Sequence, residues 1–188
     1  MYEAFRRTKE TSVKVFLSLK EQDIKIDVPV GFLRHMLELF FFNAGISAQI
    51  NASGDTHVDD HHIVEDVAIV LGKALKDLWT AEARERYGWA AMPMDDTLVI
   101  AALDLSGRGS LVWKGTFPTP KCGDFDTELI PEFWRAFSRE AALTLHLHAL
   151  CVDNSHHLAE ASFKGIGRAL REALKPSERP SSTKEIVT

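Results

Sequence analysis

The chain has 188 residues, 45% of them hydrophobic, and this length supports one domain with a substantial core. Its net charge of −5 offers no basic surface of the kind that binds nucleic acid. No apolar stretch suits a membrane span, and the first residues lack the order of a signal peptide. Cys122 and Cys151 do not make a disulfide framework. We expect a cytoplasmic protein without nucleic-acid or membrane partners.

The first half of the chain alternates between strand and helix patterns. Apolar and polar residues alternate in strands, whereas apolar residues recur three or four positions apart in helices. In chain order, the pattern predicts strands at 12–19 and 24–28, a helix at 31–44, a strand at 46–52, and a helix from a cap at Asp59 or Asp60 to about Trp79.

The second half predicts the same order of elements. Two strands are separated by the apparent hairpin turn 106–109, and residues 114–126 are expected to form a loop. Strand–strand–helix–strand–helix, twice, indicates an internal duplication. We expect one domain, 1–188, with repeats at about 8–90 and 93–175 and a tail at 176–188. The second-half elements are strands at 97–105 and 110–116, a helix from Asp126-Thr127 to about 142, a strand at 143–150, and a helix from Asn154 or Ser155 to about 174.

A His-His-x-x-Glu motif occurs at the start of the last helix of each half. The copies are His61-His62-Ile63-Val64-Glu65 and His156-His157-Leu158-Ala159-Glu160. On a helix the glutamate lies beside the preceding histidines, whereas adjacent histidines point about 100° apart. One such pair is often only a solvated helix start. Two copies with the same offset favour metal binding, and each pair would serve two centres.

The duplication suggests further ligands. His35 precedes the first motif at nearly the same interval as Glu132 precedes the second, so each is a candidate fourth ligand. Glu10 and Asp95 or Asp96 correspond similarly, each just before a strand. Three other histidines compete less strongly for a metal. Imidazole and carboxylate ligands without thiolates suit manganese, iron, zinc or cobalt. The competing histidines are His146 and His148, which alternate on a strand, and His57, near a turn.

The motif at 61–65 lies within the longer string Asp-Asp-His-His-Ile-Val-Glu-Asp at 59–66, which, with several other motifs, resembles the imidazoleglycerol-phosphate dehydratase family of histidine biosynthesis. This string is the most specific of the motifs, and the likeness extends from Arg7-Thr8-Lys9-Glu10-Thr11 to Pro180-Ser181-Ser182. It implies an α/β fold of the duplicated ribosomal-S5-domain-2 type, with helices packed between two sheets. It also implies assembly of 24 copies joined by metal ions.

The resemblance further implies a hydro-lyase that converts imidazoleglycerol phosphate to imidazole acetol phosphate. Two manganese ions would bind the substrate's imidazole ring, and Glu10 matches the family's catalytic glutamate. Glu132 stands where the family often has histidine, and a carboxylate also suits manganese. The implied metal ligands are His35, His61, His62, Glu65, Glu132, His156, His157 and Glu160. The implied substrate and phosphate contacts are Arg86, Arg108, Lys164, Asp95, Ser181, Ser182 and Lys184.

Three positions depart from the family's usual pattern near the substrate. Arg34 replaces an aspartate, Leu39 replaces a glutamine, and Thr183 displaces the terminal lysine by one residue. Two other functions compete with dehydration. A two-metal hydrolase would usually have more bridging carboxylates than this imidazole-rich set. A non-catalytic metal-binding assembly, or storage protein, would not need Glu10 and the two arginines.

Overall fold

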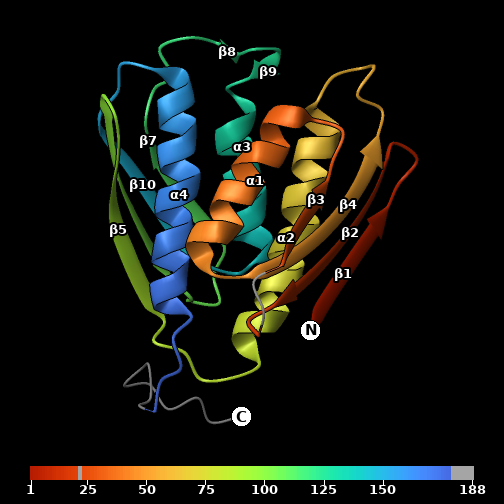
Figure 1. Cartoon of the computed structure of the whole chain (residues 1–188). Coiled ribbons are helices and arrows are strands. Elements are labelled where there is room, and N and C mark those ends of the chain that lie inside the picture. The colour runs from red at the N-terminus through yellow and green to blue at the C-terminus, as the bar shows by residue number, and fades with distance from the viewer. Residues whose placement is uncertain (21–22, 179–188) are drawn as a thin grey trace.

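A computed structural model describes residues 1–20 and 23–178 of the chain. Within them, two four-stranded sheets lie on opposite sides of a layer of four helices (Figure 1). The expected α/β class, with helices packed between two sheets, is therefore confirmed. Across the described ranges, no helix combines the length and apolar character that a membrane crossing requires.

The two sheets have the same strand order and the same directions. Counted in chain order within each sheet, the third strand is parallel to the fourth, and all other neighbouring strands are antiparallel. The first sheet has the order β1 (Tyr2–Arg7), β2 (Thr11–Ser18), β4 (Ser47–Gly54), β3 (Ile24–Asp27). The second has the order β5 (Tyr87–Met94), β6 (Thr97–Asp104), β10 (Thr144–Cys151), β7 (Ser110–Lys114).

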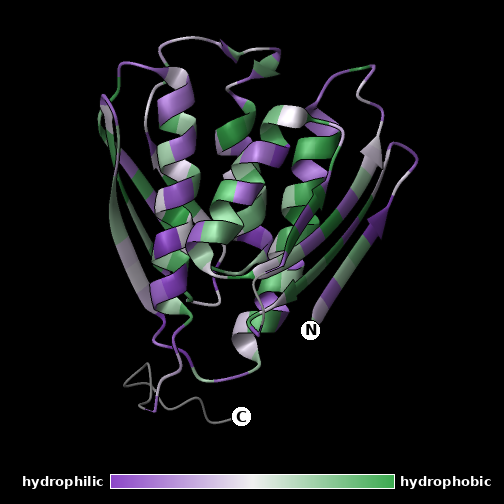
Figure 2. Ribbon diagram, viewed as in Figure 1, coloured by the Kyte–Doolittle hydropathy of each residue, from purple (hydrophilic) through white to green (hydrophobic). Residues whose placement is uncertain are grey.

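The four helices pack in two pairs between the sheets. Helix α1 (Gly31–Ala44) contacts α4 (Ser155–Ala173), and α2 (His61–Thr80) contacts α3 (Leu129–Glu140). In each pair, one helix directly precedes a central strand, β4 or β10, and the other helix carries a His-His motif. Figure 2 shows hydrophobic residues concentrated along the helices between the sheets. At the centre, the rings of Trp134 and Phe163 lie 4.6 Å apart and are fully buried.

Two equivalent glycines let the paired helices approach closely. Gly72 follows His61, and Gly167 follows His156, by the same eleven residues. A Cβ on Gly72 would lie 2.8 Å from the carbonyl oxygen of Phe137 in α3. A Cβ on Gly167 would lie 2.6 Å from that of Phe40 in α1. Each glycine thus fixes how its motif helix crosses its partner.

The pairing of strands corrects two expectations. The stretch 106–109 is not a hairpin turn, because β7 pairs with β10 and not with β6. The hairpin lies instead between β5 and β6. The edge strands β1 and β5 were not predicted, since charged residues interrupt β1, and β5 contains Gly88 and Pro93. Each four-stranded sheet therefore has one more strand than the sequence indicated.

The expected helix starts are mostly confirmed. The Asn154 side chain accepts hydrogen bonds from the backbone of His156 and His157 at 2.8 and 3.2 Å. Asp59 accepts one from the His61 backbone at 2.8 Å. The cap expected at Asp126-Thr127 was wrong: α3 begins at Leu129, and the Thr127 hydroxyl donates to the Thr119 carbonyl. The expected loop at 114–126 contains the short strands β8 (Lys121–Cys122) and β9 (Phe125–Asp126).

Candidate metal centre

One compact group of metal-ligating side chains forms where α1 meets α4. His35 Nε2 and His156 Nε2 lie 3.3 and 3.0 Å from Glu160 Oε1, and ligand atoms of all three lie within 4.8 Å of one another. Both imidazoles are about half exposed, at 48% and 47% of the side chain, whereas the Glu160 side chain is only 10% exposed. Two imidazoles facing solvent over one sheltered carboxylate can hold a divalent cation.

The Glu160 carboxylate is held in its charged form. Burial raises its pKa, but hydrogen bonds from Lys164 and the two histidines outweigh burial and lower that pKa to about 2. Lys164, one helical turn further along α4, contacts Oε2 of this carboxylate, whereas His35 and His156 contact Oε1. A charged carboxylate beside two imidazoles is the donor set that manganese, iron or zinc accepts.

The second histidine of each motif has a different partner. His62 Nδ1 lies 3.1 Å from Asp55 Oδ2, in the loop before α2. His157 Nδ1 lies 2.9 Å from Asp96 Oδ1, in the turn between β5 and β6. In both cases the hydrogen bond to aspartate is the main cause of a raised histidine pKa. A carboxylate at Nδ1 orients the ring and leaves Nε2 to bind a metal ion, as carboxylates hydrogen-bonded to metal-binding histidines commonly do.

The first motif does not form an equivalent cluster. His61 Nε2 is 4.0 Å from Glu65 Oε2, compared with 3.0 Å for the corresponding pair in α4. The Glu132 carboxylate pairs instead with Arg135, one turn along α3. Moving Glu132 toward Glu65 would bring two carboxylates together, which is unfavourable unless a cation lies between them. Among described residues, only His35, His156 and Glu160 meet as a group of three ligands.

The two expected phosphate-binding arginines lie at the other end of the second sheet. Arg86 makes two hydrogen bonds to Asp104, at 2.6 and 3.1 Å, and the bond to Asp104 is the main cause of its raised pKa. Arg108 is exposed in the loop that follows β6, and its carbonyl lies near Thr144. Asp96 and His157 are at the opposite end of β6. A strand of eight residues separates the two ends by roughly 25 Å.

The remaining expected residues are placed separately. Glu10 is exposed in the turn between β1 and β2, and its negative charge contributes to the raised pKa of His62. Asp95 is exposed in the β5–β6 turn at a φ of 47°, with its carboxylate 3.5 Å from His157 Nε2. Leu39 is half-buried against the core, whereas Arg34, on the same helix, is exposed. Ser181, Ser182, Thr183 and Lys184 lie outside the described residues.

The competing histidines do not join the three-residue group. His146 and His148 lie on the outer face of the second sheet, with ring centroids 6.3 Å apart. His57 is exposed in the loop before α2.

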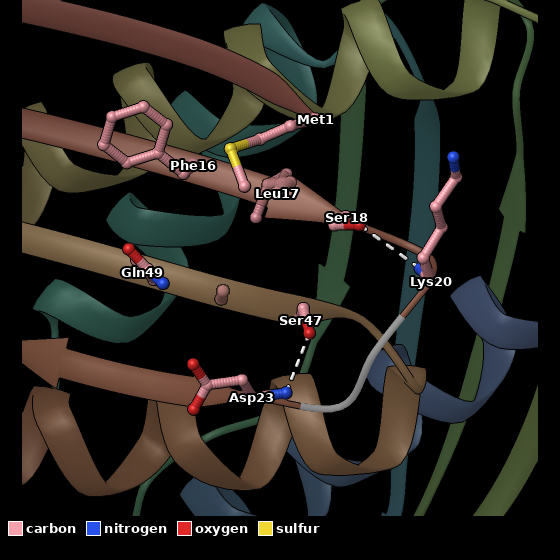
Figure 3. Close-up of a pocket in the computed structure, with 9 residues that line it drawn as sticks. Met1, Phe16, Leu17, Ser18, Lys20, Asp23, Ser47 and Gln49 are labelled. Carbon is pink, nitrogen blue, oxygen red and sulfur yellow. Dashed lines mark hydrogen bonds between the residues drawn. The ribbon is translucent and has the colours of Figure 1, made fainter.

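A hollow of about 350 Å³ occurs at the end of the first sheet where β2 ends and β4 begins, beside Ser18 and Ser47 (Figure 3). That end lies opposite the Glu10 turn, and the hollow contains no histidine.

The sequence did not identify the two aspartates that orient the second histidines as ligand partners. Asp55 was assigned only to a turn, and Asp96 only to a position before a strand. A sequence signal was present only for Asp55, which precedes His62 by seven residues, since Asp96 is sixty-one residues from His157. A carboxylate close to a predicted histidine ligand is a common orienting partner.

These features define an α/β protein with two sheets of equivalent strand order and an imidazole–carboxylate group that could hold a metal ion. A sequence model of the imidazoleglycerol-phosphate dehydratase family matches residues 28–170. The chain belongs to this family. An imidazoleglycerol-phosphate dehydratase from Bacillus cytotoxicus is 50% identical over 176 residues, covering 93% of this chain and 90% of the relative. One from Bacillus cereus is 49% identical over 172 residues, covering 90% and 89%.

Solved structures of the same enzyme share the fold. The Staphylococcus aureus imidazoleglycerol-phosphate dehydratase is 38% identical with a TM-score of 0.84, covering 93% of this chain and 99% of its own. The Pyrococcus furiosus enzyme, solved as a complex, is 37% identical with a TM-score of 0.85, covering 95% and 97%. The resemblance of fold and family noted from the motifs is thereby confirmed.

Proposed function

We propose that the protein is a hydro-lyase that dehydrates imidazoleglycerol phosphate to imidazole acetol phosphate in histidine biosynthesis. The observation that carries the proposal is the cluster of His35, His156 and Glu160 in a chain of this family. The reaction removes the hydroxyl group beside the imidazole ring and a proton from the next carbon. The resulting enol then becomes the ketone. A biosynthetic enzyme of this kind would work in the cytoplasm.

The residues of both motifs fit a pair of divalent cations, which we assign as manganese. His35, His156 and Glu160 would supply three of the metal ligands. The Nε2 atoms of His62 and His157, whose rings are oriented by their aspartates, would supply two more. His61, Glu65 and Glu132 complete the proposed ligand set. When bound, such cations would polarise the imidazole ring and so ease departure of the adjacent hydroxyl group.

Within one chain, the proposed metal ligands lie far from the proposed phosphate-binding arginines, and this separation supports a site shared between copies. A substrate held at His156 cannot reach Arg108, because the two lie at opposite ends of a strand of roughly 25 Å. The arginines would therefore bind the phosphate of a substrate held by a neighbouring copy. Assembly into a closed particle, which the family resemblance sets at 24 copies, would bring the two ends together. Ser181, Ser182 and Lys184 are proposed to close over that phosphate, and Lys164 and Asp95 to contact the substrate near the cations.

Glu10 is proposed to take part in transfer of the proton that leaves the substrate carbon when its C–H bond breaks. Its carboxylate is exposed in a short turn close to the start of α2, where a bound substrate could reach it. Carboxylates in such positions are effective proton carriers when fixed relative to the substrate. This role separates Glu10 from the residues that hold the cations.

A single substitution tests this role. Glu10→Gln preserves size and removes the charge, so formation of imidazole acetol phosphate should slow by about 10²-fold or more. Metal content and particle size should equal those of the unchanged protein, since Glu10 holds no cation. Lys9→Gln, at the neighbouring exposed position, is the matched control and should retain activity. Near-normal turnover by Glu10→Gln would remove this residue from the mechanism.

A further inference from the structure

The turn that carries Glu10 is tied to helix α2 by a buried carboxylate. Asp66 is 7% exposed and follows Glu65 directly in α2. Its Oδ1 accepts a hydrogen bond from Arg6 Nε at 2.7 Å, and its Oδ2 accepts one from the Thr11 hydroxyl. The two donors lie on either side of the turn, one in β1 and one in β2. Hydrogen bonds from a guanidinium group and a hydroxyl group to one buried carboxylate are strong and directional.

Hydrogen bonds within the turn also fix its backbone. The Thr8 hydroxyl accepts hydrogen bonds from the backbone N–H groups of Glu10 and Thr11, at 3.0 and 2.9 Å. The Thr8 N–H donates to the Thr11 carbonyl at 2.9 Å. A threonine side chain that bonds the backbone two or three residues later is a common way to fix a tight turn. The backbone is therefore held at Glu10 itself and at Thr11, the residue that follows it.

Close packing adds a third restraint. Thr11 pairs with Gly54 across β2 and β4, and it is 4% exposed. A Cβ on Gly54 would lie 3.1 Å from the Thr11 methyl group and 3.4 Å from the Glu10 carbonyl oxygen. The same Cβ would lie 3.2 Å from Ile63 in α2. The turn thus sits directly against the end of β4 and the first turn of the helix that carries His61 and His62.

The second repeat lacks this tie. Ala161 occupies the position that matches Asp66, since each follows the glutamate of its motif. In that repeat Thr97 donates instead to Asp96, within the turn itself, and Asp96 also bonds His157. The carboxylate from the helix is therefore particular to the repeat whose turn carries Glu10. A purely architectural bond would be expected in both repeats, because both have the same strand order.

We propose that Asp66 and Thr11 are positioning residues that hold the Glu10 carboxylate at the distance from the α2 histidines that proton transfer requires. The inference rests on the proposed role of Glu10. Both side chains are buried, so we expect their effect on the reaction to pass through Glu10. A displacement of a reacting group by about 1 Å can slow an enzyme by about 10²-fold. Loss of the Thr11 hydroxyl should accordingly lower kcat with little change in KM.

The test is a double-mutant cycle with a conservative control. Thr11→Val removes the hydroxyl at nearly constant volume, whereas Thr11→Ser retains it. We expect Thr11→Val to lower kcat by about 10-fold or more, with metal content unchanged and Thr11→Ser close to normal. In a Glu10→Gln background, Thr11→Val should add no further loss, because the group it positions is already absent. Arg6→Gln, at a side chain 41% exposed, tests the same tie if Thr11→Val fails to fold.

Three outcomes would overturn the inference. Equal kcat for Thr11→Val and Thr11→Ser would show that the hydroxyl positions nothing. An equal further loss in the Glu10→Gln background would place the effect elsewhere, and loss of metal would place it at the cation ligands. Full activity of Glu10→Gln alone would refute the role of Glu10 itself. That result differs from the first three, in which Glu10→Gln remains impaired.

Discussion

Three of the four motif histidines lie at hydrogen-bond distance from a carboxylate, and His61 is the exception, at 4.0 Å from Glu65. His156 faces Glu160 at 3.0 Å, and His157 faces Asp96 at 2.9 Å. The first of these pairs follows directly from helix periodicity, so the sequence alone could predict it. The second joins residues sixty-one positions apart through a turn, and spacing along the chain carries no information on such a contact. The ligand types were predictable for this reason, whereas their orienting partners were not.

Glu132 is the residue whose role depends most on a bound cation. We predict that its carboxylate leaves Arg135 and binds a cation with residues of the first motif. Glu132→Ala should then remove part of the bound metal, whereas Glu132→His, which supplies an imidazole, should retain it. Arg135→Gln is the matched control, since it removes only the ion pair seen here. Metal analysis of the purified variants measures the effect, and a full complement of metal in Glu132→Ala would exclude the residue as a ligand.

At the scale of elements, the helix crossings bring the ligands together. His35 and Glu160 come from different halves of the chain and meet only because α1 crosses α4 closely at Gly167. The helices themselves were predictable from their apolar periodicity. Their pairing was not, because it depends on which faces meet across the core. The edge strands were also missed, since a strand with one partner and few apolar residues leaves a weak pattern.

Gly167→Ala tests the importance of this crossing. The added methyl group would lie 2.6 Å from a backbone carbonyl, so the helices must separate. Overpacking of this kind costs about 1–3 kcal/mol, and the free energy of unfolding should fall by that amount. Metal binding should weaken as well, because His35 moves away from Glu160. Gly31→Ala, where a Cβ meets nothing within 4 Å, should change neither quantity. Unchanged stability in Gly167→Ala would contradict the close approach.

At the scale of the whole molecule, the two sheets have equivalent strand orders, and we propose one domain built from two repeats. Duplication of the element order was visible in the sequence, although each unit has a further strand. Duplication places proposed ligands from both halves around the helix starts. The proposed phosphate-binding arginines lie at the far end of the second sheet, so the proposed site would need residues from more than one copy of the chain.

Removal of metal should affect the assembly as well as catalysis. We expect two ions per chain, and we expect chelation to abolish dehydration and to break the particle into smaller species, because cations would link ligands from neighbouring copies. Metal analysis and size measurement before and after chelation, followed by restoration with manganese, provide the readout. Fewer than one ion per chain, or an intact and fully active particle after chelation, would contradict this expectation.

The most direct test of a shared site is the activity of mixed particles. His156→Ala removes a proposed cation ligand, and Arg108→Ala removes a proposed phosphate contact at the opposite end of the sheet. Each variant alone should be nearly inactive. If the two residues act on one substrate from different copies, particles assembled from both variants contain some sites with neither change. Formation of imidazole acetol phosphate should then rise well above that of either variant alone. Mixed particles that assemble normally yet remain as inactive as their parents would contradict the shared site.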